Sequence, residues 1–188
     1  MISEVNICNM ALTRIGQNRI MSLTQTGTLA ELCKLYYEPT LNELLSAYEW
    51  PFAISRSQLS ASAEENLTVF DYRYQLPLNY LRVLTMLSSE DYSEITDDWE
   101  IEGDKLLSDV TPAYIKYIKM ITNPTKLPQS FIEALYLRIA SKIVVKITQD
   151  QSLMAALFQE YMAAMQAAMA YLGGNKKAER QPDDWWDD

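Results

Sequence analysis

The fold class is decided by the stretch WEIEGDKLLSD at residues 99–109. Apolar Trp99 and Ile101 alternate with acidic residues up to a Gly-Asp pair at Gly103, which is typical of a hairpin turn. Because successive side chains of a strand point to opposite faces, this pattern predicts a small antiparallel sheet, which we place over about residues 70–121. The same alternation recurs over residues 70–76, 81–85 and 114–121.

Helical spacing of apolar residues flanks this region on both sides. Towards the N-terminus it begins at a candidate cap, Ser3, ends at Gly16, and resumes after a capping-box pattern at Thr28. Towards the C-terminus it resumes after a second capping-box pattern at Ser130. Pro39 should kink or divide the helix in which it lies. We predict helices over residues 3–16, 28–50, 130–149 and 151–172.

These patterns predict an α+β fold, a mainly helical bundle with a small inserted antiparallel β-sheet and an extended C-terminal tail. The chain of 188 residues is long enough for one sizeable core, so we expect a single domain over residues 1–172. Two glycines end the last helix, and the polar segment over residues 173–188 is expected to be a flexible tail.

The residue types that are missing narrow the chemistry. The sequence has no histidine, so it supplies no imidazole for Ser-His or Cys-His catalysis, or for binding zinc or haem. Its five glycines stand at predicted element boundaries, and it contains neither glycine-rich nucleotide motif. We therefore expect no enzymatic activity, no cofactor and no metal site.

Two acidic patterns in the sequence could indicate an active site or a metal site. Glu43 and Glu49 are the best pair for a glycosidase, but a solvated helix face explains them more simply. Residues 98–109 have acidic side chains at the spacing of a calcium-binding loop. However, Glu100 and Glu102, at positions three and five, are too long for such a loop, and Lys105 stands where the loop needs an apolar residue. We interpret that stretch as an acidic hairpin facing solvent or a channel. Its loop-like positions are Asp98, Glu100, Glu102, Gly103 and Asp109.

Cysteine content and net charge indicate the compartment and the partners. Cys8 and Cys33 lie in apolar helical patterns, which favours free core residues over a structural disulfide. The opening MISEVNICNM lacks the pattern of a secretion signal, so we expect a cytoplasmic product. The formal net charge of -9 disfavours specific DNA binding but suits a protein past which DNA slides.

The last predicted helix is the most informative element. Its only polar side chains from Leu153 to Leu172, apart from tyrosine hydroxyls, form a narrow stripe of Gln159, Glu160 and Gln166. A membrane span is disfavoured by the central Glu160, which leaves central burial within the monomer or burial against neighbouring subunits. Small alanines and flexible methionines suit packing between copies, which we prefer. The expected subunit interface is Leu153, Leu157, Tyr161, Met165 and Met169.

The tail ends in DDWWDD at residues 183–188. Tryptophan side chains dominate interface energies when they enter pockets on a partner, so we expect a docking peptide rather than a frayed end. The candidate docking residues are Lys176, Lys177, Arg180, Trp185 and Trp186.

Six segments in order resemble the tail tubular protein A family, the head-to-tail adaptor or gatekeeper-ring proteins of short-tailed phages. They are LTRIGQNRI, LYYEPTLNELLSAYEWPFA, YRYQLPLNYLRVL, WEIEGDKLLSD, AYIKYIKMITNPTKLPQSFIEAL and the alanine-rich last helix. The resemblance spans nearly the whole chain, and its specificity comes from the order of the motifs. Its characteristic positions are Leu12, Gly16, Pro39, Leu44, Leu45, Trp50, Phe52, Leu76, Pro77, Leu81, Arg82, Glu102, Gly103, Leu106, Leu107, Asp109, Tyr117, Phe131, Ala134 and Leu135.

The resemblance implies a structural virion protein at the head-tail junction, assembled in the host cytoplasm. It implies a ring of twelve copies that binds the portal protein and carries the tail nozzle protein, with DNA passing through the lumen without specific binding. Apart from the resemblance, we expect the tail from Asn175 to reach the portal, and we expect no membrane partner. Two alternatives stay open: a cell-wall-degrading tail enzyme and a regulatory protein-binding module.

Overall fold

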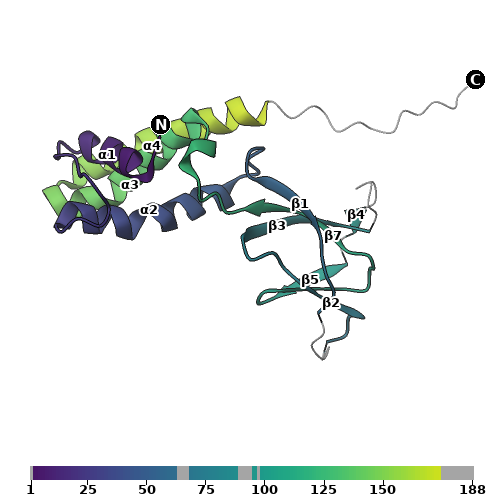
Figure 1. Ribbon diagram of the computed structural model, residues 1–188. Coiled ribbons are helices and arrows are strands. Elements are labelled where there is room, and N and C mark those ends of the chain that lie inside the picture. The colour runs from purple at the N-terminus through teal and green to yellow at the C-terminus, as the bar shows by residue number, and fades with distance from the viewer. Residues whose placement is uncertain (1, 63–67, 89–94, 97, 175–188) are drawn as a thin grey trace, which may run out of the picture. The chain divides into compact units, whose positions relative to one another are not determined.

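The computed structural model describes residues 2–62, 68–88, 95–96 and 98–174 (Figure 1). Within these residues the chain forms four α-helices and two antiparallel sheets, which confirms the predicted α+β fold. Where the sequence leads us to expect one domain over residues 1–172, residue contacts divide the chain into two compact units. The helical unit contains Met1–Leu44, Trp50–Phe52 and Asn123–Asp188, and the β unit contains Leu45–Glu49 and Ala53–Thr122.

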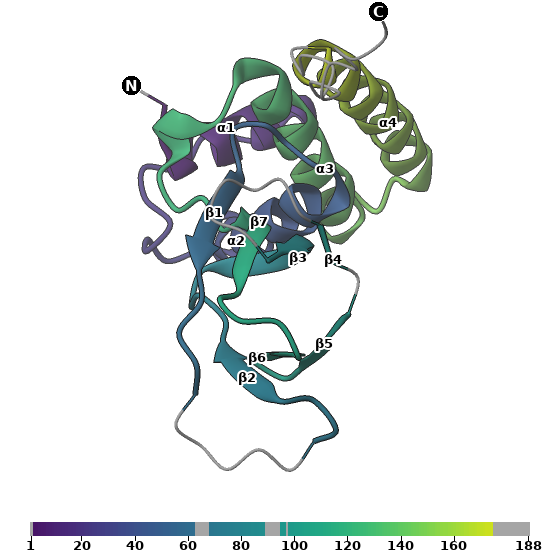
Figure 2. The ribbon, with the colours of Figure 1, turned by 90° about the vertical axis from the view of Figure 1, so that its right-hand side faces the viewer.

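The helical unit holds α1, most of α2, a short 3-10 helix η1, α3 and α4. These helices correspond to the four predicted ones, and the largest difference is at the end of α2, which stops at Ala47 rather than at residue 50. Figure 2 shows α4 at the edge of this unit, beside α3. The bounds are Glu4–Arg14 for α1, Thr28–Ala47 for α2, Pro124–Lys126 for η1, Gln129–Thr148 for α3 and Gln151–Gly173 for α4.

Side-chain caps fix the starts of the first and last helices. The Ser3 hydroxyl accepts a hydrogen bond from the backbone N–H of Asn6 at 3.2 Å, and Asp150 Oδ1 accepts one from Leu153 N–H at 2.9 Å. Each bond satisfies a backbone donor that has no partner within the helix. The Ser3 cap agrees with the sequence pattern.

At two prolines, Pro128 and Pro39, the helices differ from the sequence prediction. The capping box predicted at Ser130 does not form, because Pro128 already occupies the N-cap of α3 and Ser130 lies inside the helix. The Ser130 hydroxyl is buried and makes no hydrogen bond. Pro39 lies inside α2, which continues past it as one helix, so this proline does not divide the element.

An aromatic cluster closes the core of the helical unit. Trp50 and Phe131 are fully buried, with ring centroids 5.1 Å apart and an interplanar angle of 85°, an edge-to-face contact. Phe52 packs against both rings. The indole N–H of Trp50 donates a hydrogen bond to the carbonyl oxygen of Leu44 at 2.7 Å, so the buried polar atom is satisfied.

The β unit contains two antiparallel sheets, where the sequence suggests one. Their strand orders are β1-β7-β3-β4 and β2-β6-β5, and Figure 2 shows strands of both within this unit. One hydrophobic cluster joins them, because it includes Tyr74 and Leu106 of the second sheet with Met86 and Ile115 of the first. The bounds are Ile54–Gln58 for β1, Tyr72–Gln75 for β2, Tyr80–Leu87 for β3, Ile95–Thr96 for β4, Trp99–Glu102 for β5, Lys105–Ser108 for β6 and Tyr114–Lys119 for β7.

Two strands show what the sequence pattern could and could not locate. The hairpin of β5 and β6 lies where it was predicted: Glu102 pairs with Lys105, and Gly103 has a φ of 61°, which favours glycine. In contrast, β1 begins before the predicted sheet region and was missed. Its sequence ISRSQ does not alternate clearly, and it forms an edge strand paired with β7 alone.

Candidate functional site

One side of α4 is buried by the chain's own fold. The buried residues of this helix are Leu157, Tyr161, Met165 and Ala168, and α4 packs against α3. Three of them were assigned to a subunit interface from the sequence, and the other two assigned residues, Leu153 and Met169, are half-buried. We correct that assignment, because a partner surface on α4 has to use the opposite side of the helix.

That opposite side, the outer face of α4, is exposed and uncharged. The single charged residue of the helix, Glu160, lies beside it and forms an ion pair with Arg14 of α1. Solvent-facing helix surfaces usually carry charged residues, so an exposed face without them is unusual. Among the described residues, no helix combines the length and apolarity that crossing a membrane requires. The outer face consists of Ala155, Gln159, Met162, Ala163, Gln166 and Ala170.

A line of large apolar side chains runs along α4 and enters the outer face at Met162. Met154, Phe158 and Met162 are 36%, 38% and 40% exposed, and their four-residue spacing places them one above another. Tyr171, near the end of the helix, is 70% exposed. The helix therefore presents apolar surface on more than its buried side.

A groove of about 540 Å³ runs between α3 and α4 and includes part of this line. Its α4 wall is mainly apolar, and its α3 wall carries two cations, Arg138 and Lys142. The groove thus combines apolar contact with positive charge. We call it the α3–α4 groove; it is lined by Arg138, Ser141, Lys142, Val145, Met154, Ala155, Phe158 and Gln159.

Glu43 of α2 forms ion pairs with both cations of the groove, Arg138 and Lys142. Arg138 donates to Glu43 Oε1 from Nη2 at 2.9 Å and from Nε at 3.1 Å, and Lys142 donates to Glu43 Oε2. The Arg138 guanidinium also lies 5.3 Å from the ring centroid of Phe158 and 5.1 Å from that of Tyr161. Two cations share one carboxylate, so the cluster keeps a formal positive charge.

The cluster also argues against Glu43 as a general acid. Partial burial opposes its ionisation, but the hydrogen bonds and charges of Lys142 and Arg138 outweigh burial and hold the Glu43 pKa below its ordinary value. The general acid of a glycosidase needs a raised pKa. The geometry therefore gives Glu43 a structural role. Glu49 falls in the other unit.

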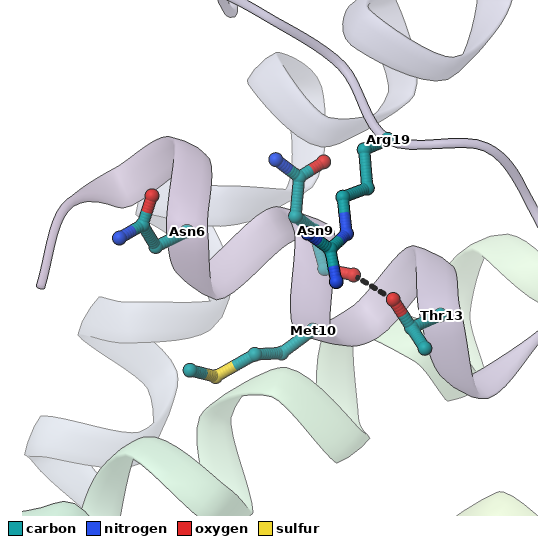
Figure 3. A pocket seen from close by; sticks show the side chains of 5 residues that line it. All are labelled: Asn6, Asn9, Met10, Thr13 and Arg19. Atoms are coloured by element: carbon teal, nitrogen blue, oxygen red, sulfur yellow. Dashed lines mark hydrogen bonds between the residues drawn. The ribbon is translucent and has the colours of Figure 1, made fainter.

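A shallow pocket of about 280 Å³ lies on α1 (Figure 3). Asn9 donates from Nδ2 to the Ile20 carbonyl at 3.0 Å and accepts from Ile20 N–H at 2.8 Å. The Thr13 hydroxyl donates to the Asn9 carbonyl at 2.7 Å. These hydrogen bonds hold the loop that follows α1 against the helix. We therefore assign the polar groups of the pocket a structural role. It is lined by Asn6, Asn9, Met10, Thr13 and Arg19.

The two cysteines are free and buried, as predicted. The fold brings Cys8 of α1 and Cys33 of α2 together, and their thiols share a hydrogen bond. That bond and burial raise the pKa of the Cys8 thiol. Both residues fill the core between the two helices.

Two of the acidic positions near the β5–β6 hairpin accept hydrogen bonds within the β unit. The Asp98 carbonyl accepts from the Ser108 hydroxyl at 2.7 Å, and Asp109 Oδ1 accepts from Asp71 N–H at 2.7 Å. A hydrogen bond from Gln75 lowers the pKa of Asp104. In the described part of the chain, no three acidic or cysteine side chains are grouped to hold a metal ion.

The predicted docking residues Lys176, Lys177, Arg180, Trp185 and Trp186 lie outside the described residues. Comparison of the sequence with protein-family models gave no match, and neither did comparison with curated proteins.

Proposed function

We propose that this protein is a structural head-to-tail adaptor of a short-tailed phage. Copies form a ring between the portal and the tail nozzle, and DNA passes through its lumen without specific binding. The protein carries out no chemistry in this role; it works as a mechanical connector. The sequence resemblance suggests the ring, and the outer face of α4 is the observation that carries the proposal.

The outer face suits contact between copies. Alanine side chains allow a neighbouring helix to approach closely, and Met162 adapts its shape to the surface it meets. Removing this face from water leaves no charge unpaired, because Glu160 is already paired with Arg14 within the chain. In a ring each copy offers one surface to the next copy and a different one to the previous copy, so the outer face needs a complementary surface elsewhere on the protein.

The negative net charge of the protein supports the proposed passage of DNA through the lumen of the ring. Each copy carries a formal net charge of -9, and a ring whose acidic surfaces face the lumen would line the channel with negative charge. DNA phosphates are repelled by such a wall, so DNA slides through without being held. In this proposal the β unit contributes its acidic hairpin, with Glu100 and Glu102 exposed, and contacts the nozzle.

Cryo-electron microscopy of the protein mixed with its portal at saturating concentration tests the proposal. We expect a closed ring on the portal. A charge placed in the outer face, Ala163→Glu, should abolish the ring because the carboxylate would be buried without a partner. The matched control, Thr26→Glu, adds the same charge to an exposed loop and should leave the ring intact. No ring on the portal at saturation would refute the proposal.

A further inference from the structure

The α3–α4 groove has the features of a peptide-binding site. Its volume of about 540 Å³ falls within the range of roughly 300–1,000 Å³ that is usual for small-ligand sites. Met154 and Phe158 supply apolar surface, while Arg138 and Lys142 stand opposite them. An occupant that fits is a large aromatic side chain flanked by carboxylates.

The charges around the groove favour an acidic occupant. Glu43 is the carboxylate that faces the two cations from α2, and it is bonded to both. Lys146, exposed one turn further along α3, adds another positive charge. Glu160 of α4 is engaged by Arg14. An incoming carboxylate thus meets a net positive wall.

The chain carries one segment with this chemistry beyond α4. In DDWWDD at residues 183–188, two indoles are flanked on both sides by pairs of aspartates. We propose that this segment docks in the α3–α4 groove of its own chain, with an indole against Met154 and Phe158 and the aspartates beside Arg138 and Lys142. An indole is also a good partner for Arg138, which already lies over two aromatic rings.

The length of the tail allows this contact. From Phe158 to the end of α4 the helix spans roughly 22 Å. The chain from Gly174 to Trp185 reaches at most roughly 36–40 Å. The segment can therefore fold back alongside α4 with length to spare. A tether this short gives an effective concentration of about millimolar, so even weak docking is populated within one chain.

Docking would cover the most apolar part of the groove in the free protein. A partner that binds the tryptophans, such as the portal in the proposed function, would have to withdraw them first. Docking would also reach Ala155 and Gln159, which the groove shares with the outer face of α4, and would leave the rest of that face, from Met162 to Ala170, uncovered for ring contacts. The inference does not depend on the proposed function, because it concerns the isolated chain.

Nuclear magnetic resonance of the full chain tests the contact. In protein carrying ¹³C-methyl methionine, deletion of residues 175–188 should shift the Met154 methyl signal and leave that of Met21, 90% exposed in a loop, unchanged. Lys142→Glu should release the Trp185 and Trp186 indoles and lower the docked-to-free ratio about tenfold, as expected for one lost charge-assisted contact. Lys34→Glu, the same reversal at an exposed α2 residue, should leave the indoles docked.

The Trp50 indole signal reports whether each variant is folded, because this side chain is buried in the helical core. Since Lys142→Glu also places a second carboxylate beside Glu43, Met154→Ser serves as a second groove variant and should release the indoles as well. Unchanged Met154 signals after the deletion would overturn the inference. Docking that disappears on dilution would overturn it too, because it would place the tail in another copy. Docking without a ring on the portal would refute the proposed function and leave this inference standing.

Discussion

Helices α3 and α4 are both strongly apolar, yet the fold treats them differently. In α3, 10 of 20 residues are buried, and they lie around most of the helix, whereas in α4 only 4 of 23 are buried, along one side. Helix α3 packs against both α1 and α4, while α4 lies at the edge of the unit. The apolar sequence of a helix indicates that its surface should be buried. The position of the helix in the bundle decides how much of that surface is buried by the same chain.

The largest expected effect comes from the first turn of α3. Phe131→Ala should lower the free energy of unfolding by about 3–5 kcal/mol, because it removes a buried ring and leaves a cavity beside Trp50 and Phe52. Urea denaturation followed by circular dichroism at 222 nm measures this loss in the helices. Phe158→Ala is the matched α4 variant; Phe158 is 38% exposed but contacts Arg138 and Tyr161, so its loss should cost less, about 1–2 kcal/mol. Equal losses would contradict the comparison.

The two sides of α4 should differ in the same measurement. Leu157→Ala, on the buried side, should cost about 2–4 kcal/mol. Met162→Ala, on the outer face, should change stability by less than about 0.5 kcal/mol. A large loss for Met162→Ala in the isolated protein would mean that its own chain already covers the outer face, and the proposed contact between copies would lose its basis.

Local chemistry explains which parts of the fold the sequence predicts. The Ser3 cap and the Gly103 turn depend on residues within a few positions of each other, and both lie where the pattern places them. Strand β1 was missed because its sequence, ISRSQ, does not alternate clearly, so no local pattern marks it as a strand. The Ser130 capping box failed because a competing local signal, Pro128, takes the cap position.

The candidate site was predicted less well than the fold. The sequence identifies α4 as a helix that needs covering, but apolar residues on both sides hide which side the chain buries. The interface assigned to Leu157, Tyr161 and Met165 therefore fell on the inner side. The α3–α4 groove was not predicted, because Glu43 and Arg138 meet only through folding, and no spacing rule joins residues so far apart.

A smaller effect is expected where α2 meets α3. Glu43→Gln should cost about 1 kcal/mol at pH 7, because Glu43 is 40% exposed and solvent screens the cluster. Its pKa is lowered in the folded state, so its stabilisation is complete above the unfolded pKa and disappears as pH falls through the folded pKa. The difference between wild type and variant should thus be constant above about pH 5 and shrink below about pH 4. A difference independent of pH would assign the effect to packing.

The smallest effect is expected for the ion pair between Arg14 of α1 and Glu160 of α4. Arg14 and Glu160 have side chains that are 44% and 47% exposed, so water and salt screen their attraction. A double-mutant cycle of Arg14→Ala and Glu160→Ala should give a coupling energy of less than about 0.5 kcal/mol in the isolated protein. In a ring, contact between copies would exclude water beside Glu160 and strengthen the pair. The same cycle measured on portal-bound protein should then give a larger coupling, and an unchanged value would argue that the outer side of α4 stays in water.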